Sequence, residues 1–437
     1  MVACSRMKNE QANWANLQLD LLTLIAKKVN FLEDFSAFRR VCRSWRSVAV
    51  KENFKGSQQL PWLMLAEENN TDYRGFVTAT DGNLIGKLLL PEAKGKRCFE
   101  SLGWLITLSE TGDMNLLHPI SQVRIPLPHV STIPISQDCI RGCMLRNFPL
   151  IQKAVLSSCP CVSSKDNNYV LMVIHGVRGF LGFWKPGDKA WTTIETRPCA
   201  FMDITYYNDM FYAVNSVGKI FVCDVGGHDP TVAHVVGAIP YEIVRKKRSY
   251  IVESKGEVLV VVRDGYDNMD YLGDNIYEEE DEDEGKDECW GGYRARMTTE
   301  FRVFKVEVSN GEWVELQSLG DNALFVGYNA SISIQAGKFQ GIRPDCIYYT
   351  DDRWPVFKWF ERGGKDMGIY SMEDPFKWFK QGGKDMGIYS MEDPFKWFKQ
   401  GGKDMGIYSM EDRSVAPFHK GGSFSRFCPP LWVRPHF

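Results

Sequence analysis

The sequence lacks the features of several common protein classes. It contains no run of about eighteen or more apolar residues, so no membrane-spanning helix and no membrane partner are expected. The N-terminal stretch, MVACSRMKNEQANW, has no apolar core of the kind that secretory signals carry. These absences favour a protein of the cytoplasm, the nucleus or both.

Cysteine pairs with the spacing of a zinc site are also missing. The 12 cysteines are scattered, and even the close pairs Cys159/Cys161 and Cys139/Cys143 have unsuitable spacing. Without a secretory signal, free thiols in a reducing compartment are a better interpretation than disulfides. We therefore expect no structural metal and no cofactor.

No catalytic constellation stands out. The sequence has no phosphate-binding loop, no nucleophile elbow and no helix with paired zinc-binding histidines. The 7 histidines are expected in separate loops or strand ends, and the carboxylate pair Asp351–Asp352 is typical of a turn or a strand end. The expectation is a protein that is not an enzyme.

Charge is low overall and is concentrated in one segment. The net charge is −3, but residues 278–288 hold nine acids and one lysine, a net of −8, which leaves about +5 for the rest of the chain. A strongly basic field, which nucleic-acid binding needs, is absent, so no nucleic-acid partner is expected. The acidic run predicts a solvated loop insertion over residues 266–296.

The N-terminal residues 14–50 carry apolar residues at helical spacing. Leu22, Ile25 and Val29 recur at i, i+3 and i+7, which predicts one face of a helix. A second helical stretch, capped by Asp34, is predicted after a break near Asn30. Its apolar residues are Phe35, Phe38, Cys42, Trp45 and Ala49. A segment this short cannot bury so much apolar surface alone, so it must pack on the next domain or on a partner.

The same segment resembles the F-box motif. The resemblance rests on Leu19-Asp20-Leu21-Leu22, on Ile25 and on the run RVCRSWR at residues 40–46. It places an F-box-like helical motif over residues 10–52 and implies docking on a Skp-type adaptor, and through it on a cullin. The adaptor-binding residues that it implies are Leu17, Leu19, Leu21, Leu22, Ile25, Val41, Cys42 and Trp45. Gln18 stands where the family has a proline, a residue that presets φ at a helix start. The alternative is an ordinary helical hairpin packed on the rest of the chain.

From about residue 61 onward, the helical periodicity fades and short apolar or alternating runs replace it. Glycine, aspartate and asparagine turns separate these runs, and residues 211–223 predict a hairpin with its turn at 215–218. Such units recur roughly every fifty residues, which favours a β-propeller over a large sandwich. Trp104, Trp191 and Trp313 are expected to fill the core between strands.

Several segments of this region resemble, in order, the KIB-type β-propeller domain of plant F-box proteins. They are residues 103–119, 183–195, 201–225, 250–265, 313–334 and 342–352. The resemblance implies a mainly β fold with a small α N-terminal module: F-box helices, a linker and entry at 53–74, and a propeller over 75–437.

Residues 356–412 contain a tandem repeat with a period of 19. Pro375–Asp393 and Pro394–Asp412 are identical, and Val356–Asp374 differs from them at three positions. Each copy predicts a hairpin, but the family pattern has room for one copy. One copy is therefore expected to complete the sheet, while identical copies leave the register weakly specified.

The resemblance implies the substrate-recognition subunit of an Skp–cullin–F-box ubiquitin ligase. The F-box would dock on the adaptor, and the β domain would bind an unknown target protein. The first alternative is a non-degradative propeller scaffold with a degenerate F-box, which binds or inhibits a regulatory protein such as a kinase. The second is an enzyme that works from a propeller channel.

Overall fold

The structure is a computed structural model that describes twelve stretches of the chain. They are residues 14–29, 31–56, 59–67, 71–134, 151–160, 168–176, 178–196, 200–264, 298–327, 329–350, 406–418 and 430–435. The chain divides into two compact units, Met1–Leu60 with Pro435–Phe437, and Pro61–Arg434. The acidic run, Asp351–Asp352, the first two repeat copies and the first part of the third lie outside the described residues.

Among its described residues, the first unit is built from three short α-helices. Its elements are η1 (Trp14–Asn16), α1 (Leu19–Ala26), α2 (Leu32–Arg40), α3 (Arg43–Val48) and η2 (Lys51–Asn53). The helices share a small core of Leu22, Ala26, Phe35, Phe38, Val48 and Ala49. Trp45 packs at its margin, with its ring 4.4 Å from that of Phe38. No helix in the described part of the chain is both long and apolar enough to span a bilayer.

Two expectations about these helices are wrong. Helix α2 begins at Leu32, so Asp34 lies inside its first turn and does not cap it. The Leu32 amide instead donates to Gln59 Oε1 at 2.7 Å, a tertiary cap that local sequence does not reveal. The stretch from Phe35 to Ala49 is two helices, because Cys42 is extended at φ −161° and separates α2 from α3.

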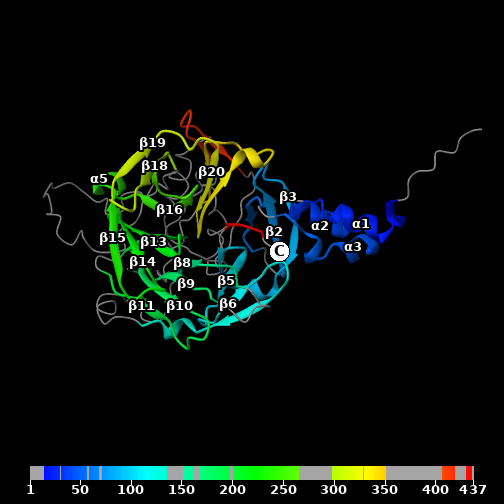
Figure 1. Cartoon of the computed structure of the whole chain (residues 1–437), viewed down its shortest axis with the longest axis horizontal. Coiled ribbons are helices and arrows are strands. Elements are labelled where there is room, and N and C mark those ends of the chain that lie inside the picture. The colour runs from blue at the N-terminus through cyan, green and yellow to red at the C-terminus, as the bar shows by residue number, and fades with distance from the viewer. Residues whose placement is uncertain are drawn as a thin grey trace, which may run out of the picture. The chain divides into compact units, whose positions relative to one another are not determined.

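The second unit is a six-bladed β-propeller, which confirms the predicted fold class. Within the described residues its strands form six sheets, arranged around a common axis in Figure 1. One strand of each sheet packs against its counterparts in the neighbouring sheets, in the closed order β25, β4, β8, β12, β16, β21. These six are the inner strands, and their packing around the ring protects the inner edges of the sheets.

The sheets follow one another along the chain. The first holds β25 (Leu431–Val433), β1 (Trp62–Met64), β2 (Tyr73–Thr78) and β3 (Leu84–Leu89). The second holds β4 (Arg97–Ser101), β5 (Trp104–Leu108), β6 (Met114–Leu117) and β7 (Arg124–Leu127). The third holds β8 (Ile151–Leu156), β9 (Leu171–His175), β10 (Phe180–Trp184) and β11 (Thr192–Ile194).

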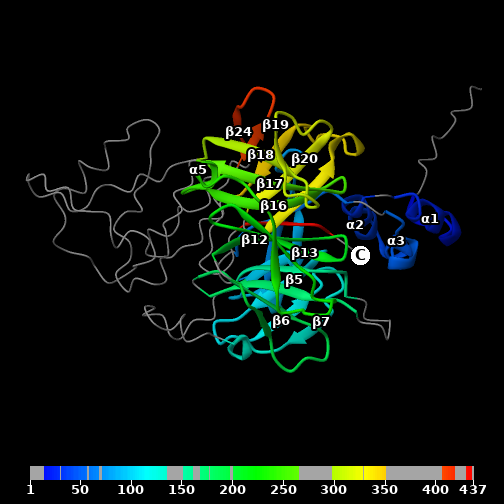
Figure 2. The same cartoon turned by 60° about the vertical axis from the view of Figure 1, so that its left-hand side comes forward.

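The fourth sheet holds β12 (Phe201–Tyr207), β13 (Met210–Asn215), β14 (Lys219–Cys223) and β15 (Ala233–Ala238). The fifth holds β16 (Arg248–Ser254), β17 (Glu257–Asp264), β18 (Glu300–Val306) and β19 (Trp313–Leu316), which lie in this order in Figure 2. The sixth holds β21 (Ala330–Gln335), β20 (Asn322–Gly327), β22 (Cys346–Tyr349), β23 (Gly406–Ser409) and β24 (Val415–Pro417). The short helices between strands are η3 (Pro91–Ala93), η4 (Val130–Thr132), α5 (Tyr241–Val244) and η5 (Ala336–Lys338).

The C-terminal strand closes the ring. Strand β25 pairs antiparallel with β1, and Trp432 lies opposite Leu63. The Trp432 side chain is fully buried and meets the ring of Phe325, on the sixth sheet, at 5.0 Å. The first and last sheets are therefore joined through a strand from the far end of the chain.

The sixth sheet departs from simple antiparallel order. Strands β20 and β21 form a hairpin, and β20 then pairs in parallel with β22. Strand β23 follows, with Cys346 opposite Ser409. Because β23 belongs to the last copy of the tandem repeat, one copy supplies a strand of the sheet, as expected.

Local patterns account for most of the strands. The predicted hairpin is present as β13 and β14, and β17 is buried along almost its whole length. Trp104 and Trp191 are buried, as expected, but the prediction for Trp313 is wrong. Trp313 is 37% exposed because β19 ends its sheet on the side away from the inner strand β16.

Candidate functional site

Helix α1 carries apolar side chains on more of its surface than its own core can cover. Leu22 and Ala26 are one turn apart and fully buried. Leu21, Leu24 and Ile25 lie together on the adjoining side of the helix and are 47%, 58% and 37% exposed. Leu19, on the other border of the buried stripe, is 55% exposed. We call Leu21, Leu24 and Ile25 the α1 face.

The structure divides the residues that the F-box resemblance implies into three groups. Leu19, Leu21, Ile25 and Val41 are exposed, and Leu22 is buried in the helical core. Leu17 and Trp45 are partly buried and pack against that core, and Cys42 is half-buried at the start of α3.

Leu24 was not among the residues that the sequence resemblance implied. The periodicity of Leu22, Ile25 and Val29 predicts one apolar face of the helix, and Leu24 lies on another side of it. The signal that reveals it is the run LDLLTLIA, which places apolar residues on several sides of one short helix.

Gln18 occupies the N-cap of α1 with φ −60° and ψ 143°, and its side chain makes no capping hydrogen bond. Its carbonyl oxygen accepts the first helical hydrogen bond, from the Leu22 amide at 3.1 Å. The backbone therefore already has the φ that a proline would impose. The start of the helix is formed without the family's proline.

A buried polar network crosses the axis of the propeller. Lys153 Nζ, on β8, lies 2.5 Å from Asp203 Oδ1, on β12, and 3.0 Å from Ser331 Oγ, on β21. The Ile251 amide, on β16, donates to Asp203 Oδ2 at 2.9 Å, and Ser331 also donates to this oxygen. Lys153 and Asp203 are almost completely buried. Burial lowers the pKa of Lys153, and the Asp203 carboxylate opposes that shift.

A second set of polar contacts extends the network to other sheets. Asn329 accepts from the Ala154 amide at 2.8 Å and donates to the Glu100 carbonyl oxygen at 2.6 Å. The Glu100 carboxylate accepts from the amides of Gly103 and Arg434 at 2.9 and 3.2 Å. Burial raises the pKa of this carboxyl group, and the two hydrogen bonds partly oppose the effect. Nearly all these charged and polar groups have partners, which is typical of a structural network rather than a reactive site.

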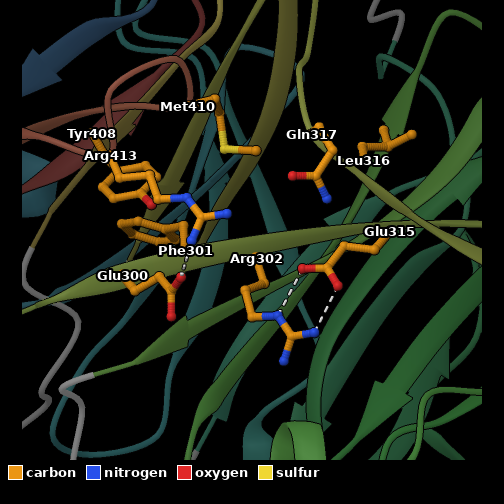
Figure 3. Close-up of a pocket in the computed structure, with 9 residues that line it drawn as sticks. All are labelled: Glu300, Phe301, Arg302, Glu315, Leu316, Gln317, Tyr408, Met410 and Arg413. Carbon is orange, nitrogen blue, oxygen red and sulfur yellow. Dashed lines mark hydrogen bonds and ion pairs between the residues drawn. The ribbon is translucent and has the colours of Figure 1, made fainter.

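A cavity of about 260 Å³ lies between the fifth and sixth sheets (Figure 3). Its lining comes from β18, β19 and the end of β23 with the turn that follows: Glu300, Phe301, Arg302, Glu315, Leu316, Gln317, Tyr408, Met410 and Arg413. Arg302 holds Glu315 through two hydrogen bonds of 2.7 Å, and Arg413 lies 3.5 Å from Glu300. The hydrogen bonds from Arg302 lower the pKa of Glu315.

The chemistry of this cavity suits contact with a polar ligand or peptide better than catalysis. Both carboxylates face an arginine, and the lowered pKa makes Glu315 a poor proton donor at neutral pH. No histidine or cysteine is among the lining residues. In the described stretches, no three histidine, cysteine, aspartate or glutamate side chains come together as metal ligands would.

Comparison with known proteins agrees with this architecture. The model of the KIB1-4 β-propeller family matches residues 76–371. The chain is similar to the F-box protein SKIP23 of Arabidopsis thaliana, with 27% identity over 83% of this chain and 88% of the relative. It is similar to the putative F-box protein At5g55150 of the same plant, with 24% identity over 78% of this chain and 86% of the relative. The F-box/kelch-repeat protein KIB1 of Arabidopsis thaliana is 23% identical over 79% of each chain.

The family match covers more than half of the chain, and the relatives align over 78–83% of it. The chain therefore belongs to the family of F-box proteins with a KIB1-4 β-propeller domain.

Proposed function

We propose that this chain is the substrate-recognition subunit of an Skp–cullin–F-box ubiquitin ligase. The α1 face would bind the Skp-type adaptor, and the propeller would hold a target protein. The chain itself would carry out no chemistry, because its contribution is to raise the effective concentration of the target near the ubiquitin-charged enzyme. Membership of the F-box family supports the proposal, and the exposed α1 face is the observation that carries it.

The size of the α1 face is adequate for a docking site. Full burial of a leucine or isoleucine side chain contributes about 1.5–3 kcal/mol relative to full exposure. Leu21, Leu24 and Ile25 are about half-exposed, so completing their burial would contribute about 1 kcal/mol each. Leu19 and Val41, both 55% exposed, would add to this total if the partner reaches them.

The test is binding of the full chain to a purified Skp-type adaptor, measured by calorimetry or a pull-down. Replacing Leu21, Leu24 and Ile25 together by alanine should weaken binding by at least about 100-fold, since roughly 3 kcal/mol is lost. The matched control is Val235→Ala with Val314→Ala, which truncates apolar side chains on the propeller that are 52% and 62% exposed. Equal binding of the triple variant and the control would contradict the adaptor proposal.

The rival proposal, a scaffold with a degenerate F-box, rests on Gln18. The φ of −60° at Gln18 weakens that argument, because the helix start has the same backbone angle that proline would give it. If the wild-type chain binds no Skp-type adaptor but still captures a protein through its propeller, the scaffold proposal is the better one.

For the target, the cavity between the fifth and sixth sheets offers a starting point. It combines a buried aromatic floor, Phe301 and Tyr408, with charged groups of both signs at its rim. A target segment with polar and charged side chains could replace the long contact between Arg413 and Glu300. Substituting Arg413 and Gln317 by alanine should reduce target capture while leaving adaptor binding unchanged.

A further inference from the structure

The turn between β23 and β24 requires a backbone conformation that proline cannot adopt. Arg413, in this turn, has φ +55°. Around it, the Ser409 amide donates to the Ser414 carbonyl oxygen at 2.9 Å, and the Ser414 amide donates to Asp412 Oδ1 at 3.1 Å. These contacts close the hairpin in which Tyr408 pairs with Val415. The proline ring fixes φ near −65°, so a proline at this position would open the turn.

The tandem copies share the sequence of the strand but differ in the residue that follows it at this turn. Within the strand, Gly406–Ser409 has the same sequence, GIYS, as residues 368–371 and 387–390. Pairing with β22 therefore does not distinguish the copies. The residue after each copy does, because the first two copies are followed by Pro375 and Pro394 and the last by Arg413.

Loop length, by contrast, favours an earlier copy as the partner of β22. The first copy begins a few residues after β22, so placing it in the sheet would leave fewer residues between the two paired strands than the segment 351–405 contains. The cost of closing a loop grows only with the logarithm of its length, so this advantage is small. An earlier copy in the sheet would also separate β23 from β24 by a second long loop in place of the tight turn.

We propose that the residue that follows each copy selects which copy enters the sheet. The copy next to Arg413 forms β23, whatever the number of copies ahead of it. The consequence reaches the cavity between the fifth and sixth sheets, because Tyr408, Met410 and Arg413 line it. The cavity keeps the same wall when copies are gained or lost, so the repeat is a tolerated insertion rather than a switch of register.

The pair Cys346 and Ser409 allows a direct test. The two residues lie opposite each other, and the next pair is hydrogen-bonded through the Met410 amide and the Asp345 carbonyl oxygen at 2.9 Å. Cα atoms of directly opposite residues are about 4.5–5.5 Å apart, within the range that a disulfide spans. Ser371 and Ser390 are the equivalent residues of the earlier copies.

The experiment compares Ser371→Cys, Ser390→Cys and Ser409→Cys in the full chain, each oxidised mildly and analysed by mass spectrometry of tryptic peptides. Ser409→Cys should form a disulfide with Cys346 with a yield at least about tenfold above the other two variants. The reason is that an earlier copy in the sheet would lose the two hydrogen bonds of the turn after β23. Ser409→Cys combined with Cys346→Ser is the control and should give no such peptide. Comparable linkage in Ser371→Cys or Ser390→Cys would overturn the proposal.

A second pair of variants tests the cause. In the Ser409→Cys background, Arg413→Gly should keep the link, because glycine adopts positive φ readily. Arg413→Pro should reduce the link strongly, although both substitutions remove the ion pair with Glu300. An unchanged link in Arg413→Pro would show that the turn does not select the copy.

Discussion

The buried pair Lys153 and Asp203 allows a quantitative test of how the propeller is held at its axis. The perturbations are Lys153→Met, which keeps most of the side-chain length, Asp203→Asn, and the two together. After Lys153→Met, the Asp203 carboxylate would stay buried with the amides of Ile204 and Ile251 and the Ser331 hydroxyl as donors, but without a cation. Removing one partner of a buried ion pair costs about 3–5 kcal/mol.

Because Asp203 keeps these donors, Lys153→Met should lower the free energy of unfolding by about 3 kcal/mol, at the lower end of this range. Asp203→Asn should cost a similar amount, since it leaves the Lys153 ammonium without its counter-charge. The double variant leaves no isolated charge, so it should cost less than the two single changes together. We expect a coupling energy of at least about 2 kcal/mol, in the upper range for residues in contact.

The assay is urea unfolding of the full chain, followed by the fluorescence of its 13 tryptophans. Lys94→Met is the matched control, because Lys94 and Asp72 form an ion pair of 2.8 Å in which both side chains are 46% exposed. An exposed pair contributes about 0–1 kcal/mol, so this variant should change stability little. Additive effects of Lys153→Met and Asp203→Asn would refute the reasoning, because they would mean that water screens the axial pair.

Three further outcomes are expected. Burial lowers the pKa of His175 from 6.5 to about 4. As the pH falls, the unfolded chain therefore binds the proton before the folded chain does, and the free energy of unfolding should fall by about 3 kcal/mol between pH 6.5 and 4. His175→Phe should remove this loss in unfolding measured across the same pH range. Gln18→Pro should leave adaptor affinity unchanged and raise the stability of the helical unit by about 0.4–1 kcal/mol; a clear loss of helical circular dichroism would contradict the N-cap assignment. Gly218→Ala should lower the melting temperature clearly, because Gly218 has φ +80° and an added Cβ would lie 2.3 Å from the Ile239 carbonyl oxygen. Gly187→Ala, at φ +97° but in open space, is its control for backbone strain alone.

Local sequence patterns predicted the parts of the fold that local interactions decide. The hairpin from Met210 to Cys223 followed from two apolar runs around a short turn, because strand pairing there needs no distant residue. The pairing of β25 with β1 and the parallel pairing of β20 with β22 were not predicted, since nothing near these strands specifies their neighbours. Gln59, which caps α2 from 27 residues away, is a similar case.

The candidate site shows the same division. The helices and their apolar character followed from periodicity, but the sequence could not separate Leu22, which is buried, from Leu24, which is exposed. That separation depends on the positions of α2 and α3. One signal was available for the axial network: Lys153 and Asp203 are the charged residues in the mostly apolar strands IQKAVL and FMDITYY. Their partnership could not be inferred, because it depends on the circular order of the sheets.

Closure of the ring by β25 has a consequence for the order of events during synthesis. The residues of the helical core, from Leu22 to Ala49, are synthesised more than 380 residues before Val433, the last residue of β25. At about 5–20 residues per second, roughly 20 to 75 seconds separate the two. Throughout that interval β1 has no β25 beside it, and the first sheet keeps an open inner edge that other chains could pair with. A nascent chain therefore presents its exposed α1 face before its propeller is closed, and β1 is expected to need protection by chaperones until β25 is made.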